Sequence, residues 1–506
     1  MTEFDALLIG SGPNGLAAAV TLARAGLSVR VYESAETYGG GLRTAELTLP
    51  GFHHDACSAV HPLALASGFF RAFRLTERVR FVTPDVSYAH PLDNGRGAVA
   101  YRNLETTVRE LGADGAAWRS LLEPLVARAD HIAQFTGSAL LPAPQRPLAG
   151  GLFGISALSQ AGGWWNARWK TAEAAALLTG TFAHSAQPLP SLAAAAAGLS
   201  LATMGHARGW PIPVGGSQTI ADALATDLRA HGGDIVTGID VHDLSDLPSA
   251  RAILFDTHIH DAVRIAGSRL RTRYRTQAAR VRSGPGVFTL HFALDGPVPW
   301  AYPHASRTAT VHLGGTRAEI ALSEAHVNRG RESENPYVLV SQPSLFDTTR
   351  APTGRHVLWT YTHVPGGSTS DRSEAIIRQI ERFAPGFRDR ILAQHSRTAR
   401  ELEAENPNNR GGDISGGAPT VRQLVARPTV SAEPWRMPGN GLYLASASAA
   451  PGPGVHGLAG YYAARSALRH EFGIHTMPSL APETGEYPSH PDHAHDRVWN
   501  DEKGQE

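Results

Sequence analysis

Three glycines near the start of the chain have the spacing of a dinucleotide-binding turn. Gly10, Gly12 and Gly15 lie in the stretch LLIGSGPNGLAAAV, together with Pro13 and Asn14. Glycine lets the backbone turn tightly there and approach a pyrophosphate closely, and a helix that follows presents its N-terminal N–H groups to the phosphates. We therefore expect these five residues to contact a dinucleotide.

The elements around this turn are of the types needed to position it. The apolar run from Asp5 to Ile9 predicts a buried strand, and the Ala- and Leu-rich stretch from Leu16 to Ala25 predicts a helix. The alternating residues LSVRVYE predict a second parallel strand, which ends at Glu33. Glu33 follows the first glycine by roughly 20 residues, where such folds use a carboxylate to bind ribose hydroxyls.

Glu33 and a second glycine run decide which dinucleotide is expected. The carboxylate of Glu33 would repel the 2′-phosphate of NADP. The run YGGGLRT places Gly40, Gly41 and Arg43 shortly after Glu33. Bare backbone there can pass along the pyrophosphate and ring of a flavin cofactor that stays bound, which an exchangeable nicotinamide cofactor does not need. The sequence therefore predicts FAD.

A glycine-rich loop near the C-terminus completes the expected flavin site. The stretch GLYLASASAAPGPGVHGLAGYYAARSAL predicts a strand, a loop and a helix, with Gly454, Val455 and His456 just before the helix. A helix N-terminus carries roughly half a positive charge, which would favour the anionic reduced flavin if it points at N1 and O2. His456 and His363 lie in glycine-flanked loops and are the candidate catalytic residues, with structural hydrogen bonding as the alternative for each.

Composition excludes several other classes of protein. The chain has 46 basic and 46 acidic residues, so its formal net charge of zero predicts no nucleic-acid partner. No apolar run approaches the roughly 18 residues of a membrane span and no signal peptide is recognisable, so a cytoplasmic protein is expected. Cys57 is the only cysteine, which excludes a redox dithiol, and the 24 histidines show no ligand spacing that predicts a metal site.

These motifs resemble those of the carotenoid/retinoid oxidoreductase family, the phytoene desaturase-like flavoproteins, over about residues 5–470. The resemblance is strongest to the branch of pyridine nucleotide-disulfide oxidoreductase domain-containing protein 2. It is carried by ELTLPGFHHDACSAVHP, PVPWAYP, TVHLGG, HVPGGSTSD, IERFAPGF, NPNNRGGDISGG and PGPGVHGLAGY. In one departure, Gly41 stands where the family has an arginine, and Arg43 follows two residues later.

The resemblance implies an α/β fold in which a Rossmann-type FAD-binding domain, of the glutathione-reductase-like and amine-oxidase-like superfamily, is interleaved with a mixed-sheet substrate domain and a helical cap. The expected domains are FAD binding at 1–80, 211–270 and 430–475, the cap at 81–210, the substrate domain at 271–429 and a disordered tail at 476–506. A strand near Ile235–Val241 should end at Val241, whose backbone holds the adenine in related flavoproteins.

The resemblance also implies an FAD-dependent oxidoreductase of the CH–CH desaturase type. It would transfer a hydride from an apolar, lipid-like or polyene substrate to flavin N5 and pass the electrons to oxygen or a quinone. A flavin-dependent double-bond isomerase and an FAD-bound regulatory protein remain as alternatives. An amine oxidase is disfavoured, because related amine oxidases hold a water near N5 with a lysine and this chain has only Lys170 and Lys503.

The stretch WWNARWK raises the question of membrane contact. Trp164, Trp165 and Trp169 stand beside Arg168 and Lys170. Indole rings next to cationic side chains are typical of a membrane interface, and a packed helical cap is the alternative. Peripheral contact at the inner membrane surface is therefore one of two expectations, and the sequence leaves the oligomeric state open.

Overall fold

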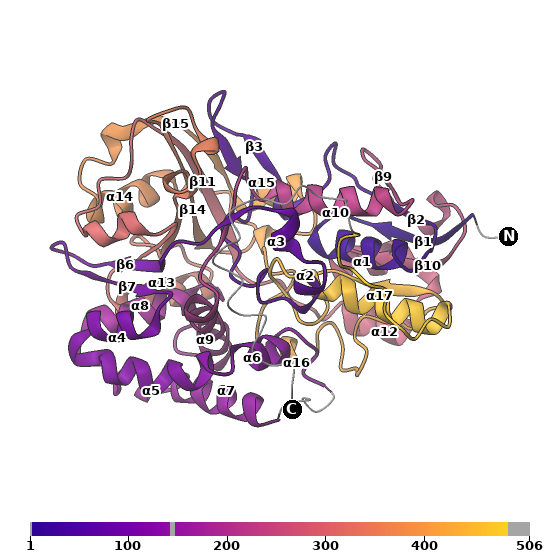
Figure 1. The fold of residues 1–506 in the computed structure, drawn as a ribbon, viewed down its shortest axis with the longest axis horizontal. Helices are drawn as coiled ribbons and strands as arrows, with labels where there is room; N and C mark the ends of the chain where they lie inside the picture. Colours follow the sequence, from indigo (N-terminus) through magenta and orange to yellow (C-terminus); the bar gives the residue numbers. More distant parts are fainter. Residues whose placement is uncertain (1–2, 142–146, 484–506) are drawn as a thin grey trace.

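Two large β-sheets carry the fold of residues 3–141 and 147–483, the part of the chain that the computed structural model describes (Figure 1). The first sheet is parallel throughout, with strand order β16-β10-β1-β2-β9. Its strands are β1 (Phe4–Ile9), β2 (Val29–Tyr32), β9 (Asp234–Val236), β10 (Ala250–Phe255) and β16 (Leu442–Leu444). They come from the three segments expected to bind FAD.

Three helices pack side by side against this sheet: α1 (Pro13–Ala23), α10 (Gln218–Ala230) and α17 (Leu458–Glu471). Helices α1 and α17 approach each other closely because Gly460 has no side chain. A Cβ at Gly460 would lie only 1.7 Å from the carbonyl oxygen of Asn14. The first turn of α1, which follows the glycine motif, is therefore held in place by the C-terminal helix.

The second sheet is mixed, with strand order β15-β11-β14-β13-β12-β6-β7. Its strands are β6 (Val86–Pro91), β7 (Gly97–Tyr101), β11 (Gly286–Leu294), β12 (Thr310–Leu313), β13 (Val338–Ser341), β14 (His356–Val364) and β15 (Ile391–Arg397). Helix α14 (Ser373–Phe383) packs on one face through Ile376 and Ile380. The other face contributes Trp359 and Tyr361 to a core shared with the cap helices.

The cap, at the lower left of Figure 1, consists of six helices. They are α4 (Leu104–Glu110), α5 (Gly115–Val126), α6 (Ala129–Thr136), α7 (Pro147–Ser159), α8 (Ala172–Ala183) and α9 (Leu192–Ala207). The expected cap also included residues 81–103, and this is wrong for β6 and β7, which belong to the second sheet. Polar residues interrupt the apolar pattern of β6 but are buried in the protein, where Ser87 Oγ donates to the carbonyl of Gly205 at 2.7 Å.

Two expected boundaries also differ in the structure. Strand β9 ends at Val236, so Val241 lies in the loop beyond it. The first part of the expected disordered tail is packed, because Leu480 is buried in the core of the first domain and the Ala481 carbonyl accepts a hydrogen bond from Arg24. The rest of that tail, residues 484–506, lies outside the described residues.

The remaining elements are short, apart from helix α13. They are β3 (Thr44–Glu46), β4 (His53–Asp55), α2 (Gly68–Ala72), α3 (Leu75–Arg78), β5 (Phe81–Val82), β8 (Ile212–Pro213), α11 (Ile259–Ala266), α12 (Thr272–Ala278), α13 (Arg317–Asn328), α15 (Ala399–Glu405) and α16 (Val421–Val425). Within the described residues, none of the helices has the length and apolar character needed to cross a bilayer.

Candidate functional site

Glu33 and the glycine turn are joined directly at the carboxyl ends of β1 and β2. Glu33 follows the last residue of β2, and its Oε2 accepts hydrogen bonds from the Ser11 backbone N–H at 3.0 Å and the Ser11 hydroxyl at 2.5 Å. Its Oε1 accepts from the N–H of Ala35 at 2.9 Å. These bonds hold the carboxylate beside the turn, where ribose hydroxyls would need an acceptor.

Asp256 is a residue of this turn that the sequence reasoning missed. It follows β10, and its Oδ2 accepts from the N–H of Gly15 at 2.8 Å. A Cβ on Gly12 would lie 2.6 Å from the same oxygen, so glycine is needed there for the carboxyl group as well as for a cofactor. An acid at the end of the predicted strand RAILFD was the available signal, since the carboxyl ends of parallel strands share one edge of the sheet.

The environment of Asp256 keeps it neutral. Burial raises its pKa to about 8, assisted by the nearby charge of Glu33 and opposed by the hydrogen bond from Gly15. At neutral pH the carboxyl group therefore carries a proton. A neutral group at this position does not repel the negative charge of a pyrophosphate.

One cavity of about 810 Å³ extends from the glycine turn to the cap. Its lining includes almost every site residue expected from the sequence: Gly10, Gly12, Pro13, Asn14, Glu33, Gly40, Gly41, Arg43, Val241, His363, Gly454, Val455 and His456. Of the expected cofactor residues, Gly15 alone is not in the lining, because Asp256 covers its N–H. Val241 lines the cavity although it is not at the end of a strand.

The first part of this cavity has groups that fit a dinucleotide. The side-chain Oδ1 of Asn14 is buried, lines the cavity and has no hydrogen-bond partner within the described chain. The two glycine runs touch, since a Cβ on Gly40 would lie 3.0 Å from the Cα of Gly12. The side chain of Arg43 folds back, and its Nε donates to the carbonyl of Gly40 at 3.0 Å.

His456 has a structural role in the loop before α17. Its Nδ1 accepts from the N–H of Leu458 at 3.1 Å, and its Nε2 donates to the carbonyl of Gly452 at 3.2 Å. Burial lowers its pKa to about 4, so the ring stays neutral near pH 7. Because both ring nitrogens are occupied, the expected catalytic role does not fit His456, which caps the helix instead.

His363 has a different arrangement, with one nitrogen held and the other side of the ring at the cavity. Its Nδ1–H donates to both carboxylate oxygens of Glu324, at 2.9 and 3.0 Å. Glu324 lies on α13 and is fully buried, and Tyr337 stacks on the imidazole with a centroid distance of 5.7 Å. Sequence reasoning did not find Glu324, because it stands on a helix that carries no motif.

The second part of the cavity is mostly apolar. It is lined by residues of the cap and of the second sheet, including Phe135, Phe153, Leu192, Leu201, Met204, Trp210, Val287, Leu339, Trp359 and Tyr361. Trp359, Tyr361 and His363 alternate along β14 and therefore share one face of the strand. An apolar molecule would lose its hydration shell in this chamber.

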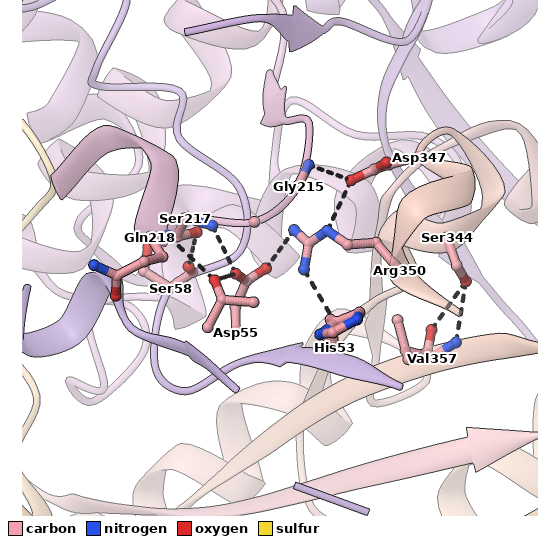
Figure 2. Close-up of polar contacts among 12 residues, drawn as sticks. His53, Asp55, Ser58, Gly215, Ser217, Gln218, Ser344, Asp347, Arg350 and Val357 are labelled. Atoms are coloured by element: carbon pink, nitrogen blue, oxygen red, sulfur yellow. Dashed lines mark hydrogen bonds and ion pairs between the residues drawn. The ribbon is translucent and has the colours of Figure 1, made fainter. Parts of the chain in front are cut away.

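A buried ionic network joins the two domains beside the cavity (Figure 2). The Arg350 guanidinium lies 2.8 Å from Asp55 on β4 and 2.8 Å from Asp347. Asp55 also accepts from the N–H of Ser217, and Asp347 accepts from the N–H of Gly215, both at 2.8 Å. The network therefore fixes the start of α10 and strand β4 relative to the loop between β13 and β14 of the second sheet.

The tryptophan cluster is largely packed inside the cap. Trp165 is 6% exposed, and the guanidinium of Arg317 lies over its ring at 4.2 Å and over that of Trp169 at 5.8 Å. Only Trp164 of the three is well exposed, at 66%. The expectation that all three indoles reach a membrane is therefore wrong for Trp165 and Trp169. Lys170 does not line the cavity, and Lys503 lies outside the described residues.

Comparison with known proteins shows which proteins the chain resembles in sequence and fold. Residues 8–73 match the family model of the NAD(P)-binding Rossmann-like domain. The chain is 25% identical to pyridine nucleotide-disulfide oxidoreductase domain-containing protein 2 of Rattus norvegicus, over 92% of this chain and 94% of the relative. It is 23% identical to the neurosporene-forming phytoene desaturase of Rhodobacter capsulatus, over 49% of this chain and 51% of the relative.

Solved structures share the fold at lower identity. An oxidoreductase from Methanosarcina mazei matches with a TM-score of 0.59 and 18% identity, over 92% of this chain and 100% of that chain. Putrescine oxidase bound to putrescine matches with a TM-score of 0.56 and 15% identity, over 92% and 98%. The expected α/β fold and the expected resemblance are confirmed: the chain has a Rossmann-like dinucleotide-binding domain and a mixed substrate sheet, and resembles phytoene desaturase and pyridine nucleotide-disulfide oxidoreductase domain-containing protein 2.

Proposed function

We propose that the protein is an FAD-dependent oxidoreductase of the desaturase type that acts on an apolar, lipid-like or polyene substrate. The observation that supports this function most is the shared cavity. One part is lined by the glycine turn and Glu33, and the other by aromatic and aliphatic side chains of the cap and second sheet. A dinucleotide in the first part and an apolar substrate in the second would meet in one space.

The residues of the first part would each hold a different portion of FAD. Glu33 would accept hydrogen bonds from the ribose, and the turn from Gly10 to Asn14 would bind the pyrophosphate. Val241 would contact the adenine. The two glycine-rich segments, at Gly40–Arg43 and Gly454–His456, would contact the flavin. When bound, FAD supplies an acceptor for a hydride and its two electrons.

The chain's own contribution to the reaction is to exclude water, place the substrate and accept a proton. The apolar chamber removes water from around the reacting carbons. His363 would take the proton from one carbon at Nε2 while the neighbouring carbon loses a hydride to FAD, and the electron pair left behind forms the new double bond. Glu324, on Nδ1, would orient the ring and stabilise the imidazolium. We propose oxygen or a quinone as the final electron acceptor.

The cofactor part of this proposal is tested by Glu33→Arg. The purified wild-type protein should be yellow with one FAD per chain, and the variant should lose the flavin because a cation replaces the ribose acceptor. Glu36→Arg is the matched control, since Glu36 is an exposed acid three residues away that does not line the cavity. Full flavin absorbance in Glu33→Arg would show that the assigned ribose site is wrong.

The reaction itself is tested by anaerobic mixing of the holoenzyme with polyene and lipid extracts, followed by mass spectrometry. A desaturase should bleach the flavin and yield a product two hydrogens lighter. A product of unchanged mass would identify an isomerase instead. A flavin that no extract reduces, and that does not reoxidise with oxygen or quinones after photoreduction, would support a regulatory role and contradict the proposed function.

A further inference from the structure

We propose that the protein docks on the surface of an anionic lipid bilayer, through an apolar rim around the cavity opening and an arginine cluster beside it. The apolar rim comprises Leu148, Ile155 and Leu158 of α7 with Val421 and Val425 of α16. The arginine cluster comprises Arg271, Arg273, Arg280, Arg282 and Arg422. This surface does not involve the buried tryptophans, and its docking does not depend on the cofactor or the substrate.

Helix α7 is apolar on both its faces. Phe153 and Ala157 are buried and line the cavity. On the opposite face, Leu148, Ile155 and Leu158 are 87%, 69% and 55% exposed. Their spacing of seven and three residues places them on one side of a helix. Residues 147–167 contain no charged side chain, so this exposed face lacks the charged groups that a surface helix normally presents to water.

Helix α16 carries the part of the rim that lies at the opening of the cavity. Val421 and Val425 both line the cavity and are 46% and 40% exposed, so they stand where it opens to solvent. Leu424, between them, lines the cavity as well. Figure 1 shows α7 at the lower edge of the molecule and α16 above it, in the lower half. An apolar substrate could pass between this rim and the chamber without crossing water.

Three members of the arginine cluster, Arg280, Arg282 and Arg422, lie on or directly beside α16. The segment 269–282, RLRTRYRTQAARVR, contains six arginines and no acidic residue. Gln423 of α16 binds this segment, because its Oε1 accepts from the N–H of Arg282 at 2.8 Å and its Nε2 donates to the Arg282 carbonyl at 2.9 Å. Arg280, Arg282 and Arg422 line one shallow hollow.

The arginines of the cluster are exposed and unpaired. Arg271, Arg273, Arg280, Arg282 and Arg422 are all exposed, and none forms an ion pair with an acidic residue in the described chain. Other arginines on the surface do form ion pairs, as Arg388 does with Glu374 at 2.8 Å. The net charge of zero therefore conceals a local excess of positive charge that faces solvent.

An anionic bilayer matches both parts of this surface. Its hydrocarbon boundary would take up the apolar rim, and its headgroups would pair with the guanidinium groups. Nucleic acid would match the arginines but would leave exposed leucine and isoleucine side chains without a partner. A second copy of the chain would bring an identical arginine cluster or need an acidic face. Both remain outcomes of the experiment below.

The experiment is co-sedimentation of the full chain with vesicles of phosphatidylglycerol and phosphatidylcholine in equal parts, or of phosphatidylcholine alone. The wild type should sediment with the anionic vesicles, less at high salt, and weakly with phosphatidylcholine. An arginine near an anionic surface contributes roughly fivefold to partitioning. Arg280→Glu with Arg282→Glu should therefore reduce binding about 25-fold or more. Ile155→Ser with Leu158→Ser should reduce the binding that persists at high salt.

Matched controls lie on the second sheet and its helix, away from this side of the molecule. Arg378→Glu changes an exposed arginine of α14, and Leu392→Ser changes a 46% exposed leucine of β15. Both should bind vesicles as the wild type does. Circular dichroism and flavin content establish whether each variant is folded, and all six substituted positions are exposed.

Three results would overturn the proposal. The first is a wild type that does not sediment with anionic vesicles. The second is that both double variants bind like the controls. The third is that the protein binds nucleic acid through the arginine cluster, or forms a dimer through the apolar rim, more tightly than it binds anionic vesicles. A chain that sediments normally but contains no flavin would contradict the proposed function and leave the docking surface supported.

Discussion

Replacing Arg350 with methionine tests the buried network that joins the two domains. Arg350 is fully buried, 2.8 Å from both Asp55 and Asp347. Burial alone would raise the pKa of Asp55, but the charge and hydrogen bonds of Arg350, with bonds from Ser217 and Thr44, hold it below its ordinary value. Methionine keeps most of the stem of the side chain and removes the charge, so two buried carboxylates lose their cation.

The expected loss in the free energy of unfolding follows from leaving two buried carboxylates without a cation. Removing one partner of a buried ion pair costs about 3–5 kcal/mol. Asp55 keeps a donor in the N–H of Ser217, and Asp347 keeps one in the N–H of Gly215. These bonds offset part of the loss at each carboxylate, so we expect the free energy of unfolding to fall by about 3–5 kcal/mol in total at pH 7.

The cost should depend on pH. In the wild type the folded pKa of Asp55 is lowered, so its contribution to stability is fully present above the unfolded value of about 3.9 and is lost as the pH falls through the folded value. In the variant, burial without the cation raises the pKa of Asp55. Asp55 then takes up a proton above pH 4, so the difference in stability between the two proteins should shrink as the pH falls toward 4.

Urea unfolding followed by tryptophan fluorescence measures this difference. Arg378→Met, at an exposed position of α14, should change the free energy of unfolding by no more than about 0.5 kcal/mol. Adding Asp55→Asn and Asp347→Asn to Arg350→Met removes the stranded charges and should restore much of the stability. The reasoning is refuted if these additions restore nothing, or if Arg350→Met costs less than about 1 kcal/mol at pH 7.

Three further predictions follow from the site and the cap. FAD affinity, measured by flavin fluorescence, should fall as the pH rises through about 8, because Asp256 ionises there, and Asp256→Asn should abolish this dependence. Gly454→Val adds a side chain at a φ of +132°, next to Leu63, and should lower the flavin midpoint potential by up to roughly 40 mV in a dye-coupled titration. Trp165→Ser should lower the free energy of unfolding by about 3–5 kcal/mol in urea, whereas Trp164→Ser should change it by less than about 0.5 kcal/mol. Three results would contradict these predictions: an Asp256→Asn protein with the wild-type pH profile, a Gly454→Val protein with the wild-type potential, and a Trp165→Ser protein with the wild-type stability.

Much of the first domain could be predicted because its signals are local. The turn, the helix, the second strand and Glu33 stand in order within one βαβ unit, and each has its own signature in turn chemistry or periodicity. The C-terminal strand, loop and helix were predictable for the same reason. The boundaries were less accurate: β9 ends at Val236 rather than Val241. Strand ends depend on pairing with neighbours, which a single stretch of sequence does not contain.

The sequence by itself thus determined the dinucleotide-binding turn, the fold class and a set of residues that nearly all line the cavity. Only the tertiary structure placed Asp256 on the N–H of Gly15, 241 residues away, and brought Glu324 to His363 and Arg350 to Asp55. These contacts join elements that have no shared motif, so burial and pairing become visible only when the sheets pack. The same holds for α7, because only the packed fold shows that one of its two apolar faces is exposed. Short motifs consist of residues that are close in the sequence, but burial and long-range pairing are properties of the packed molecule.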